Sequence, residues 1–285
     1  MANQISVGEP APGCKKVDPI LVASNVTRQF GGLTAVNVEH LEIPRGQITA
    51  LIGPNGAGKT TMFNLLTGFD KPNTGEWVFD GHNLAGVASY KVARMGMIRT
   101  FQLTKALSLL TVLDNMRLGD QKNPGEGILA SFARPLWKKH EAKITAKADE
   151  LLKRFKLDAK REDYAAALSG GQRKLLEMAR ALMSDPKLVM LDEPMAGVNP
   201  ALTQSLLEHI KGLKENGTTV LFVEHDMHMV RHISDWVIVM AEGKVVAEGP
   251  PAEVMKNPAV IDAYLGAHAN SDLGDVTIGD SKEGN

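Results

Sequence analysis

The chain has 285 residues, of which 44% are hydrophobic and 23% are charged. This balance is usual for a soluble globular protein, and the length suffices for one large α/β domain or two small ones. The formal net charge of −1 provides no overall field that would draw the protein to nucleic acid or to an anionic membrane. Cys14 is the only cysteine, so an intrachain disulfide is excluded and a reducing compartment suits the chain.

Membrane-spanning and secretory segments are not predicted. No stretch approaches the ~18 consecutive apolar residues that a transmembrane helix needs. The N-terminus also lacks the basic start and the apolar core of a signal peptide. We therefore expect any role at a membrane to depend on a partner protein.

The two ends of the chain differ in composition from its middle. Residues 1–19 are rich in Gly, Pro and polar types and are predicted to form a flexible arm. Residues 266–285 contain four acids, one lysine and several Gly and Ser residues, a composition that cannot bury a core and predicts disorder. The folded domain is expected between them, over residues 20–265.

Short apolar runs and helical stretches alternate in the first part of that domain. Gln47–Ile52 is a compact apolar run that predicts a buried strand, and Lys59–Leu66 follows as a predicted helix. Residues 87–183 are predicted to be mostly helical, without clear strands, and to form a helical lobe.

Buried strands return in the second part of the domain. Lys187–Leu191, Thr218–Val223 and Trp236–Met240 have the length and apolarity of such strands. Residues 201–215 have helical periodicity, and a hairpin is predicted over residues 237–247. The order of elements favours a mixed α/β core that is interrupted by the helical lobe.

A glycine-rich loop joins the first predicted core strand to its helix. Its residues are Gly53, Pro54, Asn55, Gly56, Ala57, Gly58, Lys59 and Thr60, which fit the pattern G-x-x-x-x-G-K-[ST] in full. Lys59 is expected to reach the β- and γ-phosphates of a nucleotide, and the Thr60 hydroxyl to ligate Mg²⁺. The alternative is a glycine-rich turn that only lets strand and helix pack. We predict a nucleotide site, to which Thr61 on the helix also belongs.

Two acids follow the predicted strand Lys187–Leu191. An acid at the tip of a buried strand can hold the water shell of Mg²⁺, which suits Asp192. Glu193 can point at a water in line with the γ-phosphate and act as its base. The alternative is an ordinary strand end with solvated carboxylates, which the upstream phosphate loop makes the less favoured interpretation.

A second helix start with glycines lies far downstream of the phosphate loop. Leu168-Ser169-Gly170-Gly171-Gln172 opens an amphipathic helix that is predicted to run to about Met183. Ser169 is a favoured N-cap residue, and such a helix start can receive an anion. One site does not need two cradles, so we expect this one to cap a nucleotide held by another subunit. The alternative is an ordinary glycine-containing helix cap.

Together these motifs resemble those of the ATPase domain of ATP-binding cassette (ABC) transporters, from about Ile20 to Leu265. The resemblance implies a P-loop NTPase fold of the ABC type, with a mixed α/β core, an antiparallel β subdomain and an inserted helical lobe. It also implies hydrolysis of ATP with Mg²⁺. Gly53–Thr60 corresponds to the family's Walker A loop, and Leu168–Gln172 matches its signature motif in every letter.

Further site residues are implied by the resemblance, position by position. Asp192 matches the Walker B aspartate, a Mg²⁺ ligand, and Glu193 matches the catalytic glutamate. Gln102 matches the Q-loop glutamine, which is implied to contact Mg²⁺ and to act in catalysis. His225 matches the switch histidine that contacts the γ-phosphate. Phe30 lies where the family places an aromatic that stacks on adenine, although an aromatic at such a turn is often simply core.

Three features resemble the branch of importers that serves branched-chain amino acids. They are the loop Ala196-Gly197-Val198-Asn199, where Asn199 replaces the commoner aspartate, an insertion at residues 119–147 of the helical lobe, and the ending Val260–Gly266. The resemblance implies import of leucine, isoleucine and valine, while related members serve urea and short amides. We hypothesise that the insertion helps to dock a membrane subunit; the alternative is that its apolar residues pack on the lobe itself.

The resemblance also implies partners. They are a second ATPase subunit, identical or paralogous, in a head-to-tail dimer, transmembrane permease subunits and, indirectly, an extracytoplasmic substrate-binding protein. The chain would then lie on the cytoplasmic face of the membrane, and no nucleic acid is expected to bind.

Other classes of function remain as alternatives. A cytosolic assembly ATPase could use the same domain, although the insertion and Tyr264-Leu265-Gly266 disfavour it. A DNA-repair or translation ATPase would be expected to have a long coiled coil or two cassettes. A metal site at His225, His228 and His232, which share a helical face, would need further ligands that the sequence does not supply nearby.

Overall fold

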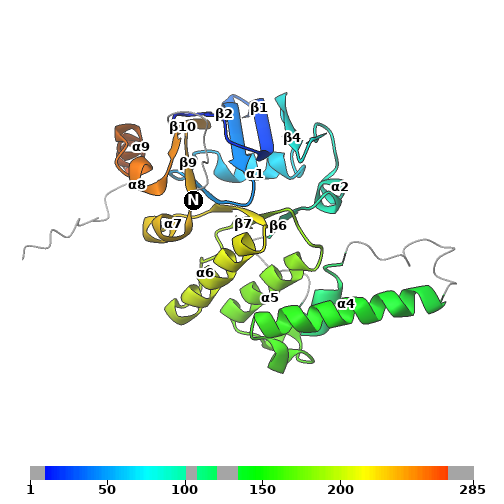
Figure 1. Ribbon diagram of the computed structural model, residues 1–285. Helices are drawn as coiled ribbons and strands as arrows, with labels where there is room; N and C mark the ends of the chain where they lie inside the picture. The colour runs from blue at the N-terminus through cyan, green and yellow to red at the C-terminus, as the bar shows by residue number, and fades with distance from the viewer. Residues whose placement is uncertain (1–9, 101–107, 121–133, 269–285) are drawn as a thin grey trace, which may run out of the picture.

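Two β-sheets and a group of helices form layers in the computed structural model, which describes residues 10–100, 108–120 and 134–268 (Figure 1). A core sheet has the strand order β10-β9-β3-β8-β7-β6, and a second sheet has the order β2-β1-β4-β5. The core strands are β3 (Ile48–Ile52), β6 (Met97–Arg99), β7 (Leu188–Asp192), β8 (Thr219–Val223), β9 (Trp236–Ala241) and β10 (Lys244–Gly249).

The core sheet is parallel except at one edge. The pairs β3–β8, β3–β9, β7–β8 and β6–β7 are parallel, whereas β10 runs antiparallel to β9. Every residue of β3 and β8 is buried, which is why both appear in the sequence as unbroken apolar runs. The predicted hairpin is confirmed as β9–β10, and its turn residues Glu242 and Gly243 both have positive φ, as a tight hairpin turn requires.

The second sheet is antiparallel and covers one face of the core. Its strands are β1 (Pro19–Phe30), β2 (Leu33–Pro44), β4 (Thr74–Phe79) and β5 (His82–Asn83). Helix α1 (Lys59–Leu66) lies between this sheet and the core sheet, and its Met62 and Phe63 are fully buried in one cluster with Trp77 and Leu221. The sheet therefore fixes the helix that follows the phosphate loop.

Helices cover the other face of the core sheet. They include α3 (Val112–Arg117), α4 (Arg134–Arg154), α5 (Gly170–Leu182) and α6 (Pro200–Glu215). A second core cluster joins Leu152, Phe155 and Leu176 of these helices and their connections to Val189 and Val220 of the sheet. The remaining helices are α2 (Ser89–Arg94), α7 (Met227–Ile233), α8 (Pro251–Val254) and α9 (Pro258–His268), with short 3₁₀ turns at Asp158–Lys160 and Ala165–Ala167.

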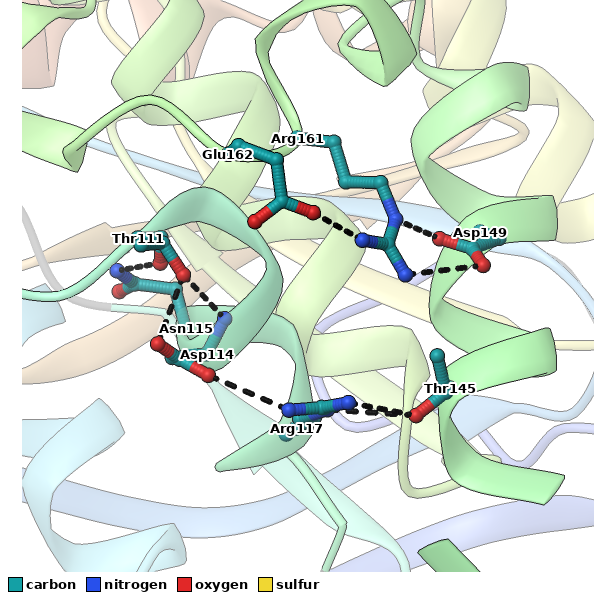
Figure 2. Close-up of polar contacts among 8 residues, drawn as sticks. All are labelled: Thr111, Asp114, Asn115, Arg117, Thr145, Asp149, Arg161 and Glu162. Atoms are coloured by element: carbon teal, nitrogen blue, oxygen red, sulfur yellow. Dashed lines mark hydrogen bonds and ion pairs between the residues drawn. The ribbon is translucent and has the colours of Figure 1, made fainter. Parts of the chain in front are cut away.

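Polar contacts fasten the helical lobe into one unit (Figure 2). The Thr111 hydroxyl caps α3 by accepting from the Asp114 N–H. Arg117 then joins Asp114 on α3 to the Thr145 hydroxyl on α4, the latter at 3.0 Å from Nη2. Arg161 donates from Nε to Asp149 of α4 at 2.6 Å. The segment that leads into α5 is thus fixed to the same helices.

The described end of the 119–147 insertion packs on this lobe. His140 lies 2.8 Å from an Asp120 oxygen, Ile144 packs on the core, and Lys147 Nζ contacts the Met183 carbonyl at 2.9 Å and Asp185 at 2.6 Å. These contacts fix the last part of the insertion to its own lobe, but they do not involve the apolar residues on which the docking hypothesis and its alternative depend. Residues 121–133 lie outside the described residues, so the docking hypothesis is not tested there.

One strand and one domain boundary differ from the sequence-based expectation. The region 87–183 was expected to lack clear strands, yet β6 lies within it and forms the edge of the core sheet. The three residues of β6 are too few to show the alternation or the apolar run by which a strand is predicted. At the other end, α9 continues to His268, beyond the expected domain boundary at 265.

The expected flexible arm is anchored in its second half. Lys16 Nζ lies 2.6 Å from Glu248 of β10, and these two side chains are 0% and 1% exposed. Glu248 also accepts from the Cys14 N–H at 2.8 Å and from the Trp236 indole N–H at 3.0 Å. A buried carboxylate with three donors holds this part of the arm against the hairpin, so residues 14–16 belong to the folded domain.

We expect Lys16→Met to lower the free energy of unfolding by about 3 kcal/mol, because it leaves the Glu248 carboxylate buried without its cation. Urea unfolding followed by tryptophan fluorescence measures this change. Lys15→Met, at an exposed neighbour, is the matched control and should unfold like the unmodified chain. Equal stability of the two variants would show that the pair contributes nothing.

Candidate nucleotide site

Close backbone contacts give the phosphate loop its curvature. Gly53 follows β3 with φ of 151°, and a Cβ there would lie 2.0 Å from the Met240 carbonyl oxygen. Gly58 caps α1 in the left-handed region with φ of 94°, and a Cβ there would lie 2.3 Å from the Ala35 carbonyl oxygen. Only glycine fits at either end, so the loop residues predicted from the sequence do form a turn between strand and helix.

Lys59 lies inside this loop. Its Nζ donates to the Gly53 carbonyl at 2.7 Å and to the Pro54 carbonyl at 2.9 Å. Burial lowers the pKa of the Lys59 ammonium, while the charges of Glu193 and Asp192 oppose that shift. The ammonium of Lys59, the first residue of α1, is therefore close enough to the acids at the end of β7 to feel their charge.

Asp192 ends β7 and is held by an arginine that was not predicted as a site residue. Arg99 Nη2 lies 2.7 Å from Asp192 Oδ2, and its Nη1 donates to Asn64 Oδ1 at 2.6 Å. Arg99 ends β6, in register beside β7. The carboxyl ends of neighbouring parallel strands meet at one edge of a sheet. Prediction of β6 from the sequence would therefore have placed Arg99 beside Asp192.

The predicted Mg²⁺ ligands Thr60 and Asp192 supply oxygen atoms, the kind of donor that Mg²⁺ prefers. Magnesium takes one or two protein oxygens and completes its shell with phosphate oxygens and water. The Thr60 hydroxyl and the Asp192 carboxylate supply that number, and Gln102, the third predicted ligand, lies outside the described residues. Among the residues described, no group of three or more His, Cys, Asp or Glu side chains is placed to hold a metal by itself.

Glu193 and His225 form a hydrogen-bonded pair. His225 Nε2 lies 2.9 Å from Glu193 Oε1. Glu193 has φ of 46°, a left-handed conformation that is unusual for this residue type, and its N–H donates to the Val223 carbonyl at 3.0 Å. The end of β8 thus turns Glu193 toward the histidine that follows β8.

The partly buried Lys174 and the buried Glu224, which the sequence did not single out, hold these loops. Lys174 of α5 donates to the carbonyls of Glu193 and Pro194, each at 3.1 Å. Glu224 accepts from the Met195 N–H at 2.9 Å and from the His225 N–H at 3.2 Å. Burial raises the pKa of Glu224 and lowers that of Lys174. The residues around Lys174 and Glu224 in the sequence do not show that these side chains bind distant backbone groups.

The signature segment lies apart from the phosphate loop. Ser169 caps α5 in a reciprocal capping box with Gln172, with distances of 3.2 and 3.0 Å. A Cβ on Gly170 would meet no atom within 4 Å, whereas Gly171 packs against Leu202. Helix α5 lies on the opposite face of the core sheet from α1 (Figure 1). The helix start is therefore exposed, and α5 lies across the core sheet from the helix that begins with Lys59.

Two other predicted positions are on the surface. The Phe30 ring is 48% exposed at the end of β1, with the Arg28 guanidinium 4.5 Å from its centroid. An exposed ring can stack on a base, so the adenine assignment stays a prediction. Asn199 caps α6 by accepting from the Leu202 N–H at 2.9 Å, a role in which Asn and Asp are equally favoured.

Comparisons with known proteins agree with this geometry. Residues 36–196 match the family described as ABC transporter, and residues 244–270 match a family described as branched-chain amino acid ATP-binding cassette transporter. The high-affinity branched-chain amino acid transport ATP-binding protein BraF of Pseudomonas aeruginosa is 40% identical over 250 residues, covering 87% of this chain and 98% of that protein.

Solved structures show the same fold. The ADP conformation of MJ1267, an ATP-binding cassette of an ABC transporter, superposes with a TM-score of 0.76 at 35% identity, covering 88% of this chain and 100% of that one. The dimeric bacterial ABC transporter cassette MJ0796 gives a TM-score of 0.69 at 27% identity, covering 81% and 98%. Since both the family match and the relative extend over most of the fold, the chain belongs to the ABC transporter family as one of its ATP-binding subunits.

Proposed function

We propose that this chain binds Mg²⁺–ATP in its phosphate loop, hydrolyses it with Glu193 as the general base, and so drives an importer of branched-chain amino acids. One observation supports the chemistry most directly. Lys59, the consecutive acids Asp192 and Glu193, and His225 come from three separate segments and lie together at the carboxyl edge of the core sheet. Ligands of open α/β sheets bind at this edge.

Each of these groups has a task in that reaction. Lys59 exchanges the carbonyls of Gly53 and Pro54 for the β- and γ-phosphate oxygens of the nucleotide. Thr60, Asp192 and Gln102 would hold a Mg²⁺ ion, which would supply positive charge against those phosphate oxygens. Glu193 accepts the proton of the attacking water, and His225 keeps the carboxylate in place through its hydrogen bond.

The second half of the site is expected from another subunit. Ser169 and Gly170 are exposed, and the N–H groups in the first turn of α5 can donate to phosphate oxygens. The similar dimeric cassette supports pairing of two ATPase subunits. We infer a head-to-tail dimer in which Ser169, Gly170, Gly171 and Gln172 close over the nucleotide of the partner, identical or paralogous.

Permease subunits are the inferred membrane partners. Among the residues described, no helix has the length and hydropathy to cross a bilayer. A groove of about 160 Å³ lies between core and lobe, lined by Ile98, Thr100, Leu118 and Ser184 among others. Leu118 is 61% exposed and Leu109 is 84% exposed, which suits contact with a partner. We infer that permeases dock here on the cytoplasmic face of the membrane and receive substrate from an extracytoplasmic binding protein.

The substrate class comes from the relatives. The similar protein of Pseudomonas aeruginosa is named for branched-chain amino acid transport, and the C-terminal match at residues 244–270 has the same description. Transport of urea or short amides by the same machine, and a cytosolic assembly role, are the competing outcomes of the tests below.

Glu193→Gln should lower the kcat of ATP hydrolysis by about 10²–10⁴-fold, because it removes a positioned general base. ATP should still bind, since Lys59 and the loop are intact. Steady-state ATPase assays and equilibrium nucleotide binding measure the two effects. Glu215→Gln, at an exposed position on α6, is the matched control. Near-normal turnover of Glu193→Gln would remove Glu193 from the catalytic role.

Lys59→Ala should abolish transport of leucine and valine by cells whose own copy of this gene is deleted. Uptake of labelled leucine, valine and urea is measured after complementation with wild type, Lys59→Ala or the exposed control Lys71→Ala. Wild type and the control should restore amino-acid uptake. A defect in urea uptake alone would assign a different substrate, and no change in any uptake would contradict the importer assignment.

A further inference from the structure

Arg99 is a buried arginine beside the expected Mg²⁺ position, and the reaction described above gives it no task. Its side chain is only 5% exposed. Nη2 donates to Asp192 Oδ2 at the end of β7 at 2.7 Å, and Nη1 donates to Asn64 Oδ1 on α1 at 2.6 Å. Helix α1 begins with Lys59 of the phosphate loop. One side chain therefore joins a predicted metal ligand to the helix that follows the phosphate loop.

The guanidinium of Arg99 is held from α1 as well as by Asp192. Arg99 is in register with Met190 of β7, and Asp192 lies two residues beyond Met190, so both side chains leave the same face of the core sheet. On that face, the guanidinium carbon lies 5.5 Å from the centroid of the Phe63 ring, which is fully buried on α1. The ring and the Asn64 amide thus orient the guanidinium independently of the carboxylate.

The contact with Arg99 occupies one of the two carboxylate oxygens of Asp192. Oδ2 accepts from Arg99, whereas Oδ1 accepts no hydrogen bond from the part of the chain that the structure describes. The terminal torsion of an aspartate is soft, so an unsupported carboxylate turns easily. In metal sites, hydrogen bonds to a ligating carboxylate fix its orientation. Arg99 is placed to do this while it leaves Oδ1 available.

An ion pair that served stability alone would need only a cation near Asp192. Lysine would provide that cation as well as arginine, and the contact with the uncharged Asn64 would be unnecessary. A planar guanidinium differs from an ammonium because its N–H groups point in fixed directions and can bind two partners at once. The bond to Asn64 therefore favours a role in orientation over a role in charge alone.

We propose that Arg99 is a positioning residue for Asp192, whose guanidinium fixes the carboxylate against α1 so that Oδ1 serves Mg²⁺ or its bound water. The effect of Arg99 on hydrolysis then acts through the affinity for Mg²⁺. The inference rests on the proposed binding of Mg²⁺ and nucleotide at the phosphate loop.

Arg99→Lys tests the proposal because it keeps the charge and removes the fixed two-pronged geometry. The Mg²⁺ concentration that gives half-maximal ATP hydrolysis should rise about tenfold, with little change in kcat at saturating Mg²⁺. In calorimetric titrations, the dissociation constant for ADP should rise about tenfold in Mg²⁺ but stay within about twofold of the unmodified chain in EDTA, where no metal contributes.

Arg45→Lys is the matched control. Arg45 also binds two side chains, Asp18 at 3.0 Å and Asp80 at 2.9 Å, but it precedes the amino end of β3, at the opposite edge of the core sheet. The same chemical change there should alter none of these quantities.

Asn64→Ala provides a second test, since it leaves Arg99 and Asp192 intact and removes the bond that orients the guanidinium. The Mg²⁺ concentration for half-maximal hydrolysis should rise about threefold. Added to Arg99→Lys, it should raise that concentration no further, because both changes act on one contact.

Two results would overturn the proposal. One is an unchanged Mg²⁺ dependence of Arg99→Lys, or of Asn64→Ala if the lysine variant does not fold. The other is an equal loss of ADP affinity in Mg²⁺ and in EDTA, which would show a merely structural role. Failure of the unmodified chain to bind ADP, or binding that Mg²⁺ does not strengthen, would instead contradict the proposed nucleotide and metal site itself.

Discussion

The rest of the site depends on the ammonium group of Lys59, a charge held inside a backbone turn. Burial alone would favour the neutral amine, and the acids Asp192 and Glu193 counteract that tendency. The turn exists because Gly53 and Gly58 lie where any side chain would collide with neighbouring backbone. The sheets on either side of α1 hold the lysine in this place. A bound phosphate group would therefore meet a cation that is already oriented, with the neutralising acids at the end of β7, beyond the intervening strand β8.

Lys174 and Glu224 connect the signature helix α5 to the loops that carry Glu193 and His225. Lys174 belongs to the same helix as the exposed Ser169 cap, yet it holds the carbonyls of Glu193 and Pro194. The Glu224 carboxylate accepts from the Met195 N–H in the loop after β7 and from the His225 N–H. A movement of α5 at a subunit interface would therefore displace the backbone of Glu193, the proposed general base. This link gives a physical route by which a partner's nucleotide could influence hydrolysis in this chain.

Much of the fold could be predicted because its signals are local. The apolar runs of β3 and β8, the phosphate loop and the hairpin turn each have their sequence pattern in consecutive residues. What escaped prediction depends on contacts between distant segments. Lys16 can be buried because Glu248 of the hairpin neutralises its charge. Strand β6 is three residues long and is formed by its pairing with β7. Arg99 likewise contacts Asp192 only because the fold places the two strand ends side by side.

The central claim is that the two halves of each nucleotide site come from different subunits. A photo-crosslinking residue at Gly170, which has open space around it, tests this in the assembled transporter. With ATP present, we expect a crosslink to the phosphate loop of the second ATPase subunit, identified by mass spectrometry, and its loss without nucleotide. A crosslink to residues 53–60 of the same chain, or none to any ATPase subunit, would contradict the account.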